Sequence, residues 1–98
     1  MFGFLRRDRK TGSGQSGPGE VTARETYEGF LLLARPRRDG GQWRVAGTIR
    51  REGDAEDGPA FDFVRADTMA DPDEATRMCL VKARQIVDEQ GERLLEGS

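Results

Sequence analysis

The chain has 98 residues, of which 35% are charged and 35% hydrophobic, and its formal net charge is -2. This length allows one small domain with a thin core, which self-association would help to stabilise. The chain has no histidine and a single cysteine, Cys79. This composition excludes an intramolecular disulfide, a thiolate metal cluster and the common histidine- or thiolate-based active sites. We therefore expect a non-enzymatic protein from a reducing, cytoplasmic setting, with no metal or cofactor.

Residues 1–24 are predicted to be a flexible N-terminal segment. An apolar start (MFGFL) precedes four basic residues within positions 6–10, and residues 11–19 (TGSGQSGPG) have the composition of a linker. The order of apolar and basic residues is the reverse of that in a secretory signal, and no apolar run approaches the ~20 residues of a membrane span. The start could hold an anionic surface weakly, although a solvated tail is favoured because five apolar residues bury little area. Residues 25–96 are predicted to form the single domain.

Three strands are predicted to follow, at about residues 26–35, 42–51 and 60–66, as an antiparallel meander. If residues 36–41 form the loop, Leu32 lies beside Val45, and Phe30 covers the bare backbone of Gly47. The acidic turn at 52–59 lacks the ligand spacing of a calcium loop and is interpreted as solvated. The register of the third strand stays open, since either the face of Phe61 and Phe63 or the face of Val64 can point inward. Arg65 and Asp67 are expected to pair.

One C-terminal helix is predicted at about residues 72–90. Asp71 can cap it and Pro72 suits its first position. Apolar residues recur at steps of three and four, at Ala75, Cys79, Ala83, Ile86 and Val87. Gly91 is expected to bend or fray the helix, while the apolar stripe continues to Leu94 and Leu95. Cys79 on this stripe is interpreted as a small buried hydrophobic residue rather than a reactive thiol. The fold class is α+β, with the helix packed on one face of the sheet.

The opposite sheet face is predicted to carry apolar residues that no helix covers, namely Leu31, Leu33 and Ala46. An uncovered apolar face on a small domain indicates a partner, and a second copy of the chain is the simplest one. We therefore expect a homodimer or a contact with another protein on this face.

Six arginines fall on the first predicted hairpin, at Arg35, Arg37, Arg38, Arg44, Arg50 and Arg51. Together they could form a basic patch that contacts a partner or nucleic acid. The alternative, which is favoured, is a solvated strand face whose charges protect a sheet edge. From Glu25 onward the chain holds eleven basic and sixteen acidic residues, a balance of -5, and a single helix cannot form a helix-turn-helix. DNA binding is possible in principle but is disfavoured by this acidic domain.

Four segments resemble the HlyU-type family of small proteobacterial proteins, which are labelled transcriptional activators. They are ETYEGF (25–30), GQWRVAG (41–47), VRADT (64–68) and KARQIVDEQGERLL (82–95). The resemblance covers about residues 25–96. It implies a regulator of transcription in the cytoplasm and supplies no catalytic or ligand-binding residues.

Three hypotheses about function follow from these observations. The leading one is a non-enzymatic cytoplasmic module, regulatory by family resemblance, that acts through protein contacts. The second is a direct DNA-binding regulator that uses the arginine-rich hairpin and the basic N-terminal tail. The third, an enzyme, is disfavoured because the chain lacks the usual acid–base and nucleophilic groups.

Overall fold

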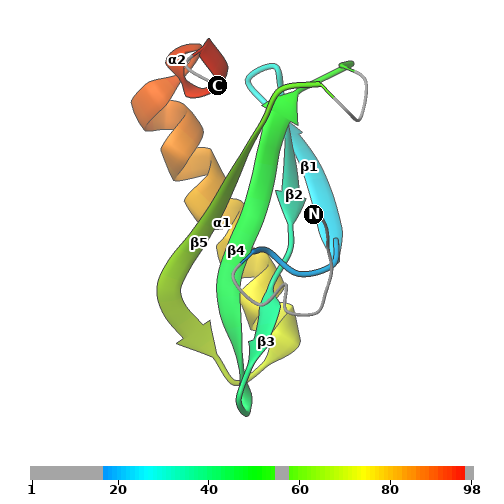
Figure 1. Cartoon of the computed structure of the whole chain (residues 1–98), viewed down its shortest axis with the longest axis vertical. Helices are drawn as coiled ribbons and strands as arrows, with labels where there is room; N and C mark the ends of the chain where they lie inside the picture. The colour runs from blue at the N-terminus through cyan, green and yellow to red at the C-terminus, as the bar shows by residue number, and fades with distance from the viewer. Residues whose placement is uncertain (1–16, 55–57, 97–98) are drawn as a thin grey trace, which may run out of the picture.

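The computed structural model of the chain describes residues 17–54 and 58–96. Within these residues, five strands and two helices follow one another: β1 (Ala23–Tyr27), β2 (Phe30–Ala34), β3 (Arg37–Asp39), β4 (Gln42–Arg51), β5 (Ala60–Met69), α1 (Pro72–Gln90) and α2 (Arg93–Glu96). The strands form one antiparallel sheet, and α1 crosses one face of it (Figure 1). The predicted α+β class is confirmed. Among the described residues, no helix is long and apolar enough to cross a membrane.

The long strand β4 is the centre of the sheet. It pairs with both β2 and β3 along one side and with β5 along the other, while β1 pairs with the outer side of β2. β2 and β3 keep one register against β4, since Leu32 lies opposite Ile49 and Arg38 lies opposite Trp43. Together they form one long hairpin with β4, interrupted at residues 35–36, where Pro36 has no N–H to donate to a ladder.

The first predicted strand is two strands in the structure. Glu28 and Gly29 adopt positive φ angles of 53° and 85° and form a tight turn between β1 and β2. β1 therefore begins at Ala23, inside the segment predicted to be flexible, and the backbone N–H of Gly19 already donates to the carbonyl of Arg35 at 2.9 Å. The predicted boundary at residue 25 stays a prediction, although described contacts extend back to Gly17. Most of the predicted tail and linker, residues 1–16, lies outside the described residues, as do residues 55–57 of the acidic turn.

The predicted strand pairing was wrong. Leu32 lies opposite Ile49 rather than Val45, and Phe30 lies opposite Arg51 rather than Gly47. The cause is the length of the loop. Asp39 pairs with Gln42, so only two residues turn the chain, instead of the six assumed from the positions of proline and glycine. The shift is an even number of residues, so each side chain keeps its predicted face.

The structure settles the register of the third strand. Phe63 lies opposite Gly47 and Phe61 lies opposite Ile49, so both rings point toward α1, and Val64 on the other face is 39% exposed. The strand continues to Met69, beyond its predicted end, through a bulge. Ala46 pairs with Val64 and Arg44 with Thr68, which leaves residues 65–67 of β5 opposite a single residue of β4.

The structure confirms the capping residue, the proline at the first position and the apolar stripe that were predicted for the helix. Asp71 caps α1 and accepts a hydrogen bond from the backbone N–H of Asp73 at 3.1 Å, and Gly91 ends the helix. Its buried side chains are those of the predicted stripe, Ala75, Cys79, Ala83, Ile86 and Val87. A separate short helix, α2, then buries Leu94 and Leu95. These side chains pack on the inner face of the sheet against Phe30, Leu32, Ala34, Val45, Ile49 and Phe63.

Side-chain contacts join the first strand to the helix. Arg84 Nη1 donates to Glu25 Oε2 at 2.5 Å, and the hydroxyl of Tyr27 donates to Asp88 Oδ1 at 2.8 Å. The hydrogen bond to Asp88 raises the pKa of Tyr27 above its ordinary value, because ionisation would remove the proton that the phenol donates to the carboxylate. The edge strand β1 is thus attached to α1 as well as to β2.

Candidate interaction surface

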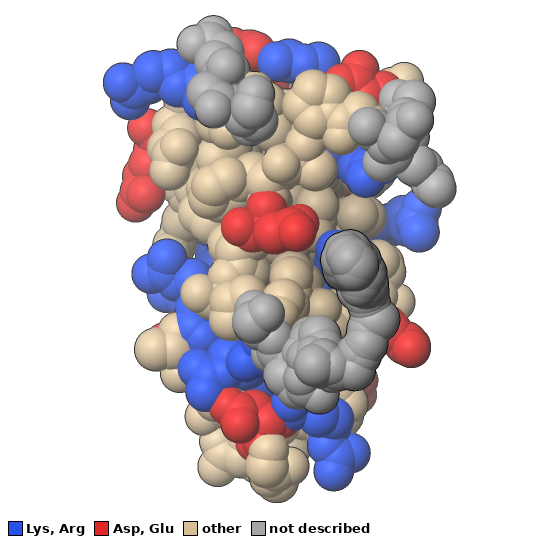
Figure 2. All heavy atoms as spheres, viewed as in Figure 1, with Lys and Arg blue, Asp and Glu red and all other residues tan. Residues whose placement is uncertain are grey.

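The sheet face turned away from α1 is the first candidate surface. Along β2, Leu31 and Leu33 point to this face and are half-buried, and Val64 of β5 is 39% exposed on it. A shallow depression of about 330 Å³ lies here; Val21, Arg24, Leu31, Leu33, Arg35, Arg50 and Asp54 line it. Figure 2 shows this face, which is largely uncharged apart from an acidic group near its middle; basic side chains lie in the half that holds β3 and also at the opposite end.

A polar network crosses this face from Arg35, the residue after β2, to β4 and β5. Arg35 Nη1 donates to Thr48 Oγ1 at 2.7 Å, and Thr48 Oγ1 donates to Asp62 Oδ1, also at 2.7 Å. The Nε of Arg35 donates to the carbonyl of Gly19 at 2.7 Å. Thr48 is only 2% exposed, so the network satisfies a buried hydroxyl and fixes the guanidinium of Arg35. Arg35 is therefore committed to contacts within the chain.

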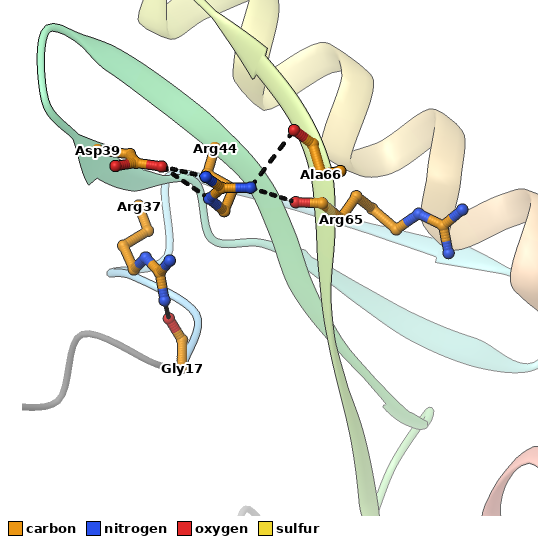
Figure 3. Close-up of polar contacts among 6 residues, drawn as sticks. All are labelled: Gly17, Arg37, Asp39, Arg44, Arg65 and Ala66. Atoms are coloured by element: carbon orange, nitrogen blue, oxygen red, sulfur yellow. Dashed lines mark hydrogen bonds and ion pairs between the residues drawn. The ribbon is translucent and has the colours of Figure 1, made fainter.

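Arg44 occupies the bulge of β5 (Figure 3). Its guanidinium contacts Asp39 on one side, with Nε 2.9 Å from Oδ2, and donates from Nη1 to the carbonyls of Arg65 at 3.2 Å and Ala66 at 3.3 Å. The bulge removes these carbonyls from the ladder, and the planar fork of arginine can reach them and a carboxylate together. The side chain of Arg65 points away from Arg44 (Figure 3).

The predicted pair of Arg65 with Asp67 was wrong. Asp67 Oδ2 lies 3.7 Å from Lys82 Nζ on α1 instead. The pairing assumed a regular strand, in which residues two apart share a face, and the bulge removes that regularity at 65–67.

A second concave surface lies at the far end of the hairpin, and no sequence motif predicted it. A pocket of about 330 Å³ is lined by Gly19, Glu20, Thr22, Pro36, Arg37, Arg38 and Trp43; we refer to it as the Trp43 pocket. The guanidinium of Arg38 lies over the indole of Trp43, 5.2 Å from the ring centroid. Arg37 Nη1 donates to the carbonyl of Gly17 at 3.2 Å (Figure 3).

The remaining two arginines lie apart from this pocket. Arg51 Nη2 lies 2.7 Å from Glu92 Oε1, and its guanidinium lies over the ring of Phe30 at 5.7 Å. The hydrogen bond from Arg51 holds the pKa of Glu92 below its ordinary value. Arg50 lines the depression beside Leu31 and Leu33.

The six arginines therefore do not share one surface. Arg35, Arg37, Arg44 and Arg50 alternate onto the uncovered face, while Arg38 and Arg51 belong to the other set of side chains. Of the predicted dimer-face residues, Leu31 and Leu33 lie on the uncovered face, and Ala46 is fully buried. The proposed roles of both sets stay predictions.

No group of acidic, cysteine or histidine side chains among the described residues could hold a metal ion. Cys79 is buried on α1, and its Sγ accepts from the backbone N–H of Ala46 at 3.4 Å. Desolvation raises the pKa of this thiol, so the reactive thiolate is disfavoured at neutral pH.

The fold and surface define a small α+β domain with a single sheet, one covering helix and an arginine-rich hairpin. The chain belongs to the family described as Transcriptional activator HlyU, which it matches over residues 5–95. No curated protein and no solved structure matches the chain. The family description indicates a regulatory role connected with transcription.

Proposed function

We propose that this protein is a non-enzymatic cytoplasmic regulator of transcription that acts through protein contacts on the uncovered sheet face. The family description supplies the connection with transcription. The observation that carries the choice of protein contacts is that three of the six hairpin arginines already contact carboxylates within the chain. Arg35, Arg44 and Arg51 each contact a carboxylate of the same chain.

Binding of duplex DNA requires arginines and lysines that release counterions from phosphates. An arginine already paired with a carboxylate must exchange that partner, which removes much of the gain. The described residues hold twelve basic and fifteen acidic side chains, a balance of -3, so the domain also repels DNA at long range. Leu31, Leu33 and Val64 offer apolar area that a protein can cover.

Direct DNA binding is the second candidate function. The basic side chains in the half of the uncovered face that holds β3 favour it, although other basic side chains lie at the opposite end (Figure 2). The basic residues at positions 6–10 would add to this charge, although they lie outside the described residues.

A titration of fluorescent duplex DNA with the full chain, at low and at moderate salt, separates the two candidates. We expect weak, salt-sensitive binding that is lost in a variant with Arg6, Arg7, Arg9 and Lys10 replaced by glutamine. Such a result would assign the residual affinity to the N-terminal charges. Tight binding that survives in this variant would support direct DNA binding and contradict our proposal.

The sheet face is tested by a double variant, Leu31→Asp with Leu33→Asp. Both side chains are half-buried on the surface, so circular dichroism must first show that the variant folds. We expect the wild-type chain to self-associate or to cross-link to a partner protein in cells, and the variant to do neither. A monomeric mass at high concentration by light scattering, together with no cross-linked partner, would count against this face as an interface.

A further inference from the structure

The Trp43 pocket lies at a different place from the uncovered leucine face, and the packing of the chain explains why it stays open. Gly19 approaches the hairpin so closely that a Cβ would lie 2.3 Å from the carbonyl oxygen of Pro36. This contact and the hydrogen bond from Arg35 Nε to Gly19 fix residues 19–22 as one wall of the pocket. Pro36 and β3 form the other wall. The indole of Trp43 is half-buried between them and is not part of the main core.

The charges at this pocket differ from those of the rest of the hairpin. Among the described residues, no carboxylate lies within ion-pair distance of Arg37 or Arg38. Arg37 donates to a backbone carbonyl and Arg38 stacks on an indole, so neither guanidinium group is paired with a carboxylate of the described residues. Glu20 is the single acidic residue that lines the pocket. The pocket is thus locally basic on a domain that is acidic as a whole.

We propose that the Trp43 pocket binds an acidic peptide segment of a partner protein, with one apolar or aromatic side chain of that segment inserted beside the indole. A volume of about 330 Å³ is at the lower limit of small-ligand pockets and suits one large side chain. Tryptophan and arginine are the residues most enriched at interface positions that dominate binding energy. Arg37 and Arg38 then contact the carboxylates on either side of the anchor.

The proposal rests on the proposed function only in that the ligand is a protein, and it is independent of the Leu31 and Leu33 face. A nucleic acid is the less suitable occupant for two reasons. The pocket walls are mostly apolar, which suits a side chain rather than a phosphate, and the acidic domain around the pocket repels a polyanion with long-range charge more than it repels a short peptide.

Trp43 is the only tryptophan of the chain, so its emission reports on this pocket directly. The probe is a blocked heptapeptide, EEDFDEE, titrated into the full-length protein at low and moderate salt. One control peptide has alanine in place of the phenylalanine, and a second has lysine in place of every acidic residue. A short duplex DNA is titrated in parallel. We expect a saturable change in emission with EEDFDEE below about 1 mM, a much weaker one with the alanine peptide and none with the lysine peptide.

Matched variants assign the binding to the two arginines. Arg38→Gln and Arg37→Gln should each weaken binding of EEDFDEE about fivefold, as the loss of one solvent-exposed ion pair predicts. Arg77→Gln on the exposed side of α1 should leave the affinity unchanged, and thermal unfolding should show that all three variants fold. The proposal is overturned if EEDFDEE produces no change up to 1 mM, if the alanine peptide binds equally well, or if duplex DNA alone changes the Trp43 emission. The double variant Leu31→Asp with Leu33→Asp tests the other surface, so its outcome does not affect the peptide titration.

Discussion

The ring of Phe63 lies directly against the backbone of Gly47, in the centre of the sheet. A Cβ built on Gly47 would be 2.8 Å from Phe63 Cζ and 2.5 Å from the carbonyl oxygen of Leu33. The ring can shift, but the carbonyl belongs to the neighbouring strand and cannot move without breaking the ladder. The glycine is therefore required by close packing on both sides.

Gly47→Ala should destabilise the protein by about 2 kcal/mol, the usual cost of overpacking a core position. Gly41→Ala, at the tip of the hairpin, is the matched control, because no atom lies within 4 Å of its added Cβ. Chemical denaturation of both variants measures the difference in the free energy of unfolding. Equal stability of the two variants would show that the sheet adjusts freely around Gly47.

Arg44 should contribute to stability through the bulge of β5 rather than through charge alone. Arg44→Lys keeps the charge but cannot reach Asp39 and the carbonyls of Arg65 and Ala66 together, so we expect a loss of about 1 kcal/mol. Amide hydrogen exchange should become faster at residues 65–68 and stay unchanged in β2. Arg77→Lys, on the exposed side of α1, is the control and should have no effect. A uniform increase in exchange across the sheet would contradict a local role.

Glu28 is a non-glycine residue with a positive φ of 53° in the turn between β1 and β2. Glutamate is poorly suited to this conformation, whereas Asn-Gly is the preferred pair for such a turn. Glu28→Asn should therefore stabilise the protein by about 0.5–1 kcal/mol and raise Tm by a few degrees. Gly29→Ala, with φ at 85°, should lower Tm. A lower Tm for Glu28→Asn would show that the glutamate side chain has a stabilising contact that outweighs the turn geometry.

Cys79 should resist thiol reagents in the native protein and react only when the domain opens. Desolvation raises the pKa of its thiol, so the folded state holds the proton more tightly than the unfolded state above about pH 9. The contribution of the protonated Cys79 thiol to the free energy of unfolding is complete below the ordinary pKa of 9.0. It decreases as the pH rises through the higher native pKa. Labelling with Ellman's reagent across a urea titration tests the first point.

The pH dependence is tested by comparison with Cys79→Ala. This variant should lose on the order of 1 kcal/mol at pH 7 and should show a smaller decrease in stability between pH 9 and pH 10.5 than the wild type. Parallel decreases in the two proteins would mean that other groups, such as Tyr27, account for the alkaline loss.

The helix could be predicted from the sequence because its signals are local. Asp71, Pro72 and the apolar stripe lie within one segment, and all of them act as expected. The faces of the strands could also be predicted, since alternation is local. The pairing could not be predicted correctly, because it depends on the number of residues in the turn, and Pro36 interrupts the hairpin without ending it. For the same reason, the aromatic cover of Gly47 was expected from Phe30 and comes from Phe63.

The candidate surfaces were predicted in part. Leu31 and Leu33 follow from alternation alone, and the structure places them on the face opposite α1. The Trp43 pocket could not be foreseen, because one of its walls comes from residues 19–22, which belong to the segment predicted to be flexible. No pattern within that segment shows that Gly19 hydrogen-bonds to Arg35 across the fold.

The attachment of β1 to α1 has a consequence for how the chain folds during its synthesis. Glu25 contacts Arg84 and Tyr27 contacts Asp88, so partners of the first strand are separated from it by 59 and 61 positions. A ribosome synthesises the chain from its N-terminus at roughly 5–20 residues per second. The apolar inner face of the sheet therefore stays exposed for about several seconds until α1 has been synthesised. During that interval the exposed strands are the part of the nascent chain that most needs protection from aggregation. The last turns of α1 therefore complete a fold whose sheet cannot be buried before they emerge.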